Sequence, residues 1–183
     1  MTPMLRRLIT VAVLILGVGP GHASSLNIVA VGASNTLGWG VGVETAFPAR
    51  LQTILRQRGI DATVTNAGII ASTTAGMLSR IDRVVPNGTN IVILQPGTND
   101  LRFGGSEHQR TANISAIVDR LQQRHIRVIV YDPEIPRNFL QADGIHFTAS
   151  AHDNIAMTLA AQITGEQETP SFFVAPRAGK VIE

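Results

Sequence analysis

Residues 26–36 read Leu-Asn-Ile-Val-Ala-Val-Gly-Ala-Ser-Asn-Thr, an apolar run that passes directly into a glycine and then into small and polar residues. An apolar run of this length that ends at a glycine is typical of a parallel strand covered on both faces. The sequence therefore predicts a buried strand over residues 26–31, with Ser34 just beyond its carboxyl end.

The same strand-like pattern recurs three times along the chain and alternates with helical periodicity. Strands are predicted at residues 61–66, 90–95 and 126–131, and helices at residues 47–58, 73–85, 108–125 and 148–163. This alternation predicts an α/β fold in which helices cover both faces of a parallel sheet. In such sheets the ligand site lies outside the carboxyl ends of the strands.

The first 23 residues have the layout of a signal peptide. Arg6 and Arg7 precede an apolar stretch at residues 8–16, and small residues stand at Gly21 and Ala23. We expect cleavage after Ala23 and export to a periplasm or to the exterior. The alternative is an uncleaved anchor, but the apolar stretch is shorter than the roughly 20 residues that a spanning helix needs.

Composition limits the partners and the chemistry. Loss of Arg6 and Arg7 with the leader would bring the 15 Lys and Arg residues level with the 13 Asp and Glu residues. Because no basic run remains, nucleic acid is not an expected partner, and no stable membrane anchor is expected after cleavage. The chain has no cysteine, which excludes disulfides and thiolate nucleophiles. Residues 24–165 are expected to form one domain and residues 166–183 a C-terminal tail.

Polar residues gather directly after three predicted strands and before the last predicted helix. The four groups are Ser34, Asn66-Ala67-Gly68, Gly97-Thr98-Asn99-Asp100 and Asp143-Gly144-Ile145-His146. Because parallel strands end at a common edge of the sheet, the four groups are expected to meet at one rim.

Ser34, His146 and Asp143 are the residue types of a nucleophilic triad. A serine hydroxyl is a poor nucleophile at neutral pH, so it needs a base within hydrogen-bond reach, and that base needs an orienting partner. His146 fits the base, and Asp143, three residues earlier, fits the group that orients the imidazole. The backbone N–H groups of Ser34 and Gly68 and the side-chain amide of Asn99 are candidate donors to an oxyanion.

Together the four groups resemble the signature blocks of the SGNH hydrolases, also called GDSL-type lipases and esterases. Residues 32–36, 66–68, 97–100 and 143–146 occur in that family's order and on the expected elements. The resemblance covers roughly residues 26–163 and implies a three-layer, flavodoxin-like α/β/α fold. It also implies that Ser34 is the nucleophile, that Gly68 and Asn99 join Ser34 in the oxyanion hole, and that Asp143 and His146 complete the triad.

Two departures from the family pattern bear on the substrate. The usual Asp before the nucleophile is Ala33 here, and only eleven residues separate Tyr131 from Asp143, where members commonly insert a further helix and strand. We therefore expect a sheet of four to five strands and a short or open wall of the acyl pocket. Trp39, Thr98 and Ile145 are candidate pocket residues, although Trp39 fits equally a side chain that only packs its loop.

Other patterns favour structural interpretations. Asp100 is expected to be structural and to cap the next segment, and His108, His125 and His152 are expected to be structural, with His152 capping or bracing the last helix. Gly38–Gly42 does not continue as a dinucleotide-binding G-x-G-x-x-G motif because residue 43 is valine. The G-x-S-x-G elbow of the α/β-hydrolases is absent because Thr36 stands at its second glycine. No metal-binding motif appears, and no cofactor or metal is expected.

The resemblance implies a hydrolase of carboxylic esters or thioesters that acts through an acyl-Ser34 intermediate on a small-molecule substrate, and the leader alone predicts its export. Arylesterase, acyl thioesterase and lysophospholipase activities all fit, and the compact domain favours small or medium acyl chains. Two alternatives stay open at this point. One is a carbohydrate O-acetylesterase of the envelope, and the other is a non-catalytic binding domain that keeps the fold.

Overall fold

The computed structural model describes residues 25–166, which form a four-stranded parallel sheet. The strands are β1 (Leu26–Gly32), β2 (Ala62–Gly68), β3 (Ile91–Gln95) and β4 (Arg127–Val130). Their order across the sheet is β2-β1-β3-β4, with every pair parallel. The predicted leader, residues 1–23, and the predicted tail beyond Glu166 lie outside the described residues.

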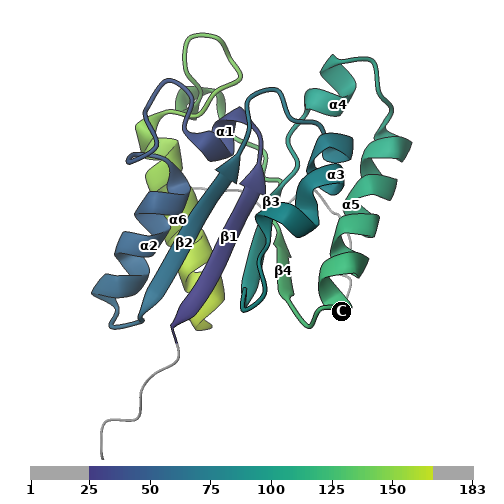
Figure 1. The fold of residues 1–183 in the computed structure, drawn as a ribbon. Coiled ribbons are helices and arrows are strands. Elements are labelled where there is room, and N and C mark those ends of the chain that lie inside the picture. The colour runs from purple at the N-terminus through teal and green to yellow at the C-terminus, as the bar shows by residue number, and fades with distance from the viewer. Residues whose placement is uncertain (1–24, 167–183) are drawn as a thin grey trace, which may run out of the picture.

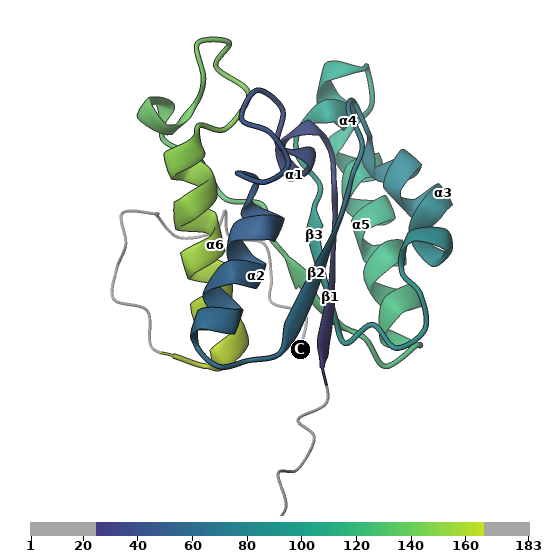
Figure 2. The same cartoon turned by 60° about the vertical axis from the view of Figure 1, so that its left-hand side comes forward.

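Helices cover both faces of the sheet, as Figures 1 and 2 show. One face carries α2 (Phe47–Gln57) and α6 (Ala149–Thr164), and the other carries α3 (Thr74–Val84) and α5 (Glu107–Gln122). Ile28 and Ala30 of β1 pack in the α2/α6 core, while Val29 and Val31 pack in the α3/α5 core. This alternation explains why β1 is apolar at consecutive positions: both of its faces are buried.

The strand order places a change of winding direction between β1 and β3. The chain moves outward from β1 to β2 and then returns past β1 to β3. The carboxyl ends of β1 and β3 therefore flank a crevice, which is where open α/β sheets bind ligands. Ser34 follows β1 at this crevice, and Asn99 follows β3.

Short elements that the sequence did not predict stand at this edge of the sheet. They are α1 (Ser34–Leu37), α4 (Asn99–Arg102) and the 3₁₀ turn η1 (Arg137–Phe139). One helical turn shows no hydrophobic periodicity, so the sequence carries no signal for it.

The segment between β4 and α6 contains no fifth strand among the described residues. It passes through η1 and an isolated antiparallel bridge between Leu140 and Phe147 before α6 begins at Ala149. The sheet thus has the lower of the two predicted strand numbers. Within residues 25–166, no helix is long and apolar enough to cross a membrane.

Candidate active site

Ser34 is the first residue of α1, and it lies two residues beyond the buried strand β1. The turn between strand and helix is tight enough to require glycine at position 32, because a Cβ there would meet Thr36 Oγ1 at 1.9 Å. The Thr36 hydroxyl is buried and donates to Gln95 Oε1 at 2.5 Å. This bond ties α1 to the end of β3 and fixes the position from which Ser34 projects.

Ser34, His146 and Asp143 form the hydrogen-bonded chain that the sequence predicted. His146 Nε2 lies 3.0 Å from Ser34 Oγ, and His146 Nδ1 lies 2.5 Å from Asp143 Oδ2. The other Asp143 oxygen accepts from the backbone N–H groups of Ile145 and His146 at 2.9 and 3.0 Å. An imidazole held in this way can accept the serine proton on Nε2 while the carboxylate stabilises the imidazolium that forms.

The hydrogen bonds to Asp143 also set its charge. The bond from the His146 side chain, followed by those from the His146 and Ile145 backbone, lowers the pKa of Asp143 from 3.8 to about 2. Hydrogen bonds to a carboxylate favour its charged form. Asp143 is therefore ionised at neutral pH.

The predicted oxyanion donors lie at the same edge but differ in what they already bind. Asn99 begins α4, and its Nδ2 donates to Ser72 O at 3.0 Å. The Gly68 N–H donates to Asn66 Oδ1 at 3.0 Å. The side-chain nitrogen of asparagine carries two N–H groups, so Asn99 Nδ2 keeps one of them free for a ligand. A backbone nitrogen such as that of Gly68 carries only one N–H group. The oxyanion role of Gly68 stays a prediction, and it requires the bond to Asn66 to open.

A buried arginine fastens the ends of β1 and β2 behind Ser34. Arg80 of α3 donates to Ala67 O at 2.7 Å and to Gly32 O at 3.0 Å. Burial, with a contribution from Arg83, lowers the pKa of its guanidinium. The sequence did not single out Arg80, because its partners are backbone carbonyls that carry no residue-specific signal.

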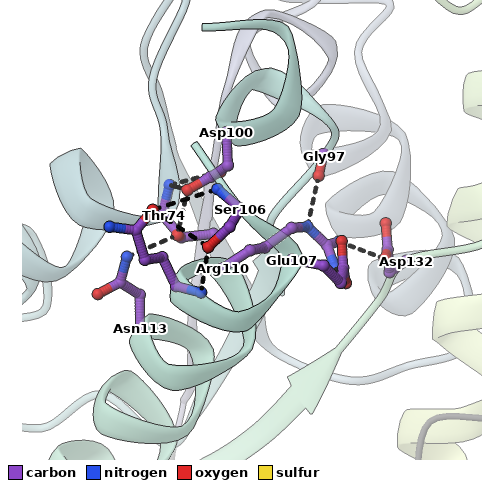
Figure 3. A network of polar contacts seen from close by, with 9 residues as sticks. Thr74, Gly97, Asp100, Ser106, Glu107, Arg110, Asn113 and Asp132 are labelled. Carbon is purple, nitrogen blue, oxygen red and sulfur yellow. Dashed lines mark hydrogen bonds and ion pairs between the residues drawn. The ribbon is translucent and has the colours of Figure 1, made fainter. Parts of the chain in front are cut away.

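Figure 3 shows the polar network that holds the loop after β3. Asp100 is buried and accepts from the Thr74 hydroxyl at 2.6 Å and from the Thr74 N–H, at the start of α3. Arg110 of α5 donates to Gly97 O at 3.0 Å and pairs with Asp132. Asp100 was expected to cap the segment that follows it, but its carboxylate instead bonds to the start of α3, which precedes it in the chain. The network holds both sides of Asn99.

A cleft of about 490 Å³ opens beside Ser34, over the ends of β3 and β4. Thr98 and Ile145 line this cleft, whereas Trp39 is not among its lining residues. Their role as substrate-pocket residues stays a prediction. The Trp39 ring lies 5.8 Å from the His146 ring, on the loop after α1, and is half exposed. The short segment before Asp143 supplies one wall through Asp132, Pro133, Glu134 and Ile135.

A family model for GDSL-like lipases and acylhydrolases matches residues 30–162. The chain belongs to this family. The match includes all four polar groups that resembled the family's signature blocks. Among the described residues, no group of three or more His, Cys, Asp or Glu side chains is placed to hold a metal ion.

Two curated proteins are similar to this chain. An arylesterase of Vibrio mimicus is 26% identical over 117 residues, which cover 63% of this chain and 58% of the relative. Esterase TesA of Pseudomonas aeruginosa is 25% identical over 119 residues, which cover 64% of this chain and 59% of the relative. The aligned part of the chain thus spans about three fifths of the length of these relatives.

Solved structures share the GDSL-like fold. AlinE4, described as an SGNH-hydrolase family esterase, is 30% identical, with a TM-score of 0.58 over 83% of this chain and 79% of that chain. A crystal structure of TesA is 20% identical, with a TM-score of 0.69 over 77% of this chain and 99% of that chain. The α/β/α fold expected from the sequence is confirmed.

The sequence analysis gave no role to two side chains that bond to the segment around His146. Asn35 bonds to the backbone on both sides of His146, and Gln141 Nε2 bonds to Phe147 O and Trp39 O, both at 2.8 Å. Their partners are backbone atoms, most of them about one hundred residues away, so no local pattern marks them.

Proposed function

We propose that this chain is a serine hydrolase that cleaves carboxylic esters through an acyl-Ser34 intermediate. One observation carries the proposal: Ser34 Oγ, the His146 imidazole and the Asp143 carboxylate form a continuous hydrogen-bonded chain at the crevice between β1 and β3. Membership of the GDSL-like family supports it, since the similar proteins named above are esterases.

The two half-reactions use the same three side chains. Ser34 Oγ attacks the ester carbonyl carbon as His146 Nε2 takes the hydroxyl proton, and the carbonyl π electrons move onto the oxygen. When the tetrahedral intermediate collapses, the bond to the alcohol breaks and His146 gives its proton to the leaving oxygen. Water then attacks the acyl-Ser34 carbonyl with His146 again as base, which releases the acid and restores the serine.

The oxyanion is stabilised by donors at the ends of the strands. The Ser34 N–H and the second N–H of Asn99 supply two of them, and Gly68 is the third candidate. Such donors lower the barrier because they are already oriented when charge develops on the oxygen.

Hydrolysis of a p-nitrophenyl ester series from acetate to palmitate tests the proposal. We expect turnover that is fastest on short or medium acyl chains and is lost in Ser34→Ala. A Ser79→Ala variant is the matched control, because Ser79 is exposed on α3 and donates only to Gly76 O. Equal rates in the parent and Ser34→Ala would contradict the mechanism, and no turnover in either would favour a binding domain.

A carbohydrate O-acetylesterase is the second candidate, and the cleft gives a specific reason for it. Polar side chains reach the lining from three segments, including Asn35, Gln95, Asp132 and Glu134. Hydroxyl-rich leaving groups need such partners, whereas long acyl chains need an apolar wall. Release of acetate from an acetylated oligosaccharide, faster than from p-nitrophenyl acetate at equal concentration, would support this candidate. Thioester cleavage uses the same residues and is measured with acyl-coenzyme A.

We also propose that the chain is exported and that residues 24–165 form the functional domain. Arg6, Arg7, the apolar stretch at residues 8–16 and the small residue Ala23 support export. Expression of the full chain in a bacterial host, followed by mass spectrometry of the periplasmic fraction and the medium, tests it. A product that begins at Ser24 is expected, and a full-length product that stays with the cells would contradict the proposal.

A further inference from the structure

The segment that carries His146 is attached to α1 by the side chain of Asn35, the residue next to Ser34. Asn35 Nδ2 donates to Ile145 O at 3.2 Å, and Asn35 Oδ1 accepts from Phe147 N at 3.0 Å. One carboxamide thus bonds to the residues before and after His146. This is the pattern that a backbone amide makes with a neighbouring parallel strand.

We propose that Asn35 is a positioning residue, which sets the distance between His146 Nε2 and Ser34 Oγ by holding the backbone on both sides of His146. The inference rests on the proposed esterase function. Asn35 does not touch the reacting atoms, because both of its hydrogen bonds go to backbone groups.

Asp143 cannot perform this task. It belongs to the same turn as His146, and its second oxygen bonds to the backbone N–H groups of Ile145 and His146. It therefore orients the imidazole within its own segment, and a displacement of the whole segment would carry both residues away from Ser34 together. The Asp143 side chain is 41% exposed, so burial of the carboxylate does little to hold the turn against α1.

Asn35 supplies the missing connection because it lies on the same short helix as the nucleophile. Gln141 makes a second attachment, but its Nε2 reaches Trp39 O, in the loop after α1, and Phe147 O within its own segment. The Asn35 bonds join residues 110 and 112 positions apart, directly between the two halves of the triad. A catalytic base that is about 1 Å out of place can cost on the order of 100-fold in rate.

The test is a double-mutant cycle with Asn35→Leu and His146→Ala in the full protein. Leucine is close to asparagine in size but makes no hydrogen bond. We measure kcat and KM on p-nitrophenyl acetate, the rate of Ser34 labelling by a fluorophosphonate, and the thermal unfolding midpoint of each protein. Asn27→Leu is the matched control, because Asn27 lies at the opposite end of β1 and its side chain donates to Gly88 O at 3.3 Å.

We expect Asn35→Leu to lower kcat and the labelling rate by roughly 100-fold with KM little changed, since alignment of the base matters in the transition state. In the His146→Ala background the same substitution is expected to change neither rate further, because no imidazole remains to be misplaced. Asn35→Asp keeps the acceptor for Phe147 N but loses the donor to Ile145 O. Its kcat and labelling rate are expected to lie between those of the parent and those of Asn35→Leu.

Three results would overturn the inference. Unchanged kcat and labelling in Asn35→Leu, with an active parent, would show that the segment needs no such attachment. If Asn35→Leu lowered kcat and the labelling rate by the same factor in the parent and in His146→Ala, and also lowered the unfolding midpoint, Asn35 would only stabilise the folded structure. A parent that neither hydrolyses the ester nor labels at Ser34 would overturn the proposed function and this inference with it.

Discussion

At the scale of single residues, Asn99 is the side chain whose removal reports most directly on the chemistry. It stands at the first position of α4, and its bond to Ser72 O orients the amide while leaving one N–H group for the substrate. An oriented donor of this kind acts on the negative charge of the transition state more than on the neutral ester.

We therefore expect Asn99→Ala to lower kcat by roughly 100-fold to 1000-fold, the usual cost of removing one oxyanion donor, with a much smaller effect on KM. Steady-state hydrolysis of p-nitrophenyl butyrate measures both constants. Asn154→Ala is the control, because Asn154 makes a similar side-chain bond to Ser150 O on the far helix α6. If kcat of Asn99→Ala matched that of the control, Asn99 would have no place in the oxyanion hole.

The sequence predicted those site residues that a pattern within a few neighbouring positions marks, and it missed those marked only by contacts with distant residues. Ser34 follows an apolar strand, and Asp143 stands three residues before His146, so both positions are visible in a few neighbouring residues. Asn35 could not be assigned, because its partners lie more than one hundred positions away. For Gly68 the pattern located the end of β2, but it did not show that Asn66 Oδ1 already accepts its N–H.

At the scale of elements, α2 and α5 end in the same motif with different residues. After α2, Gly59 has φ of 78° and Ile60 N donates to Leu55 O. After α5, His125 has φ of 58° and Ile126 N donates to Leu121 O. The left-handed conformation is easy for glycine and costs other residues about 1 kcal/mol.

This difference explains one boundary that the sequence analysis misplaced. Gly59 marked the end of α2 close to Gln57, where the structure has it, whereas α5 was predicted to continue to His125 and ends at Gln122. No glycine or proline marks that end. The four strands were predicted to within two residues at their ends. For β1 and β3 the signal is a buried apolar run between turn residues, whereas β2 contains two threonines and an asparagine and is half-buried.

The same difference predicts opposite effects of two substitutions. His125→Gly is expected to raise the free energy of unfolding by about 0.5–1 kcal/mol, because the left-handed residue then carries no Cβ, although glycine also loosens the unfolded chain. Gly59→Ala is expected to lower it by a similar amount. Urea unfolding followed by circular dichroism measures both. A His125→Gly protein less stable than the parent would show that the histidine side chain contributes more than its backbone costs.

At the scale of the whole molecule, His152 joins the two helices that cover one face of the sheet. It lies on α6, is fully buried between Phe47 and Phe147, and accepts from Phe47 N at the start of α2 through Nδ1 at 3.1 Å. The sequence analysis expected a structural role on α6 itself. His152 is structural, but the helix whose end it caps is α2, because the topology places the two helices side by side.

Its burial makes the stability of the molecule depend on pH. Burial lowers the pKa of His152 from 6.5 to about 4, partly offset by Asp153. Below pH 6.5 the unfolded chain therefore binds a proton that the folded chain excludes, and folding stability falls as the pH falls toward 4. One pKa unit corresponds to 1.36 kcal/mol, so the full loss is about 3 kcal/mol. Asp143 also lowers the folding stability as the pH falls, but only below about pH 4, since folding lowers its pKa from 3.8 to about 2.

Urea unfolding at intervals from pH 7.5 to pH 4.5 should therefore show a decline in the parent that is much weaker in His152→Asn. Asparagine can still accept from Phe47 N but does not titrate, so this variant is expected to be less stable than the parent at pH 7.5 and to approach it at pH 4.5. His108→Asn is the control, because it makes the same substitution at an exposed histidine on α5. Parallel curves for the parent and His152→Asn would show that the acid sensitivity of the fold arises elsewhere.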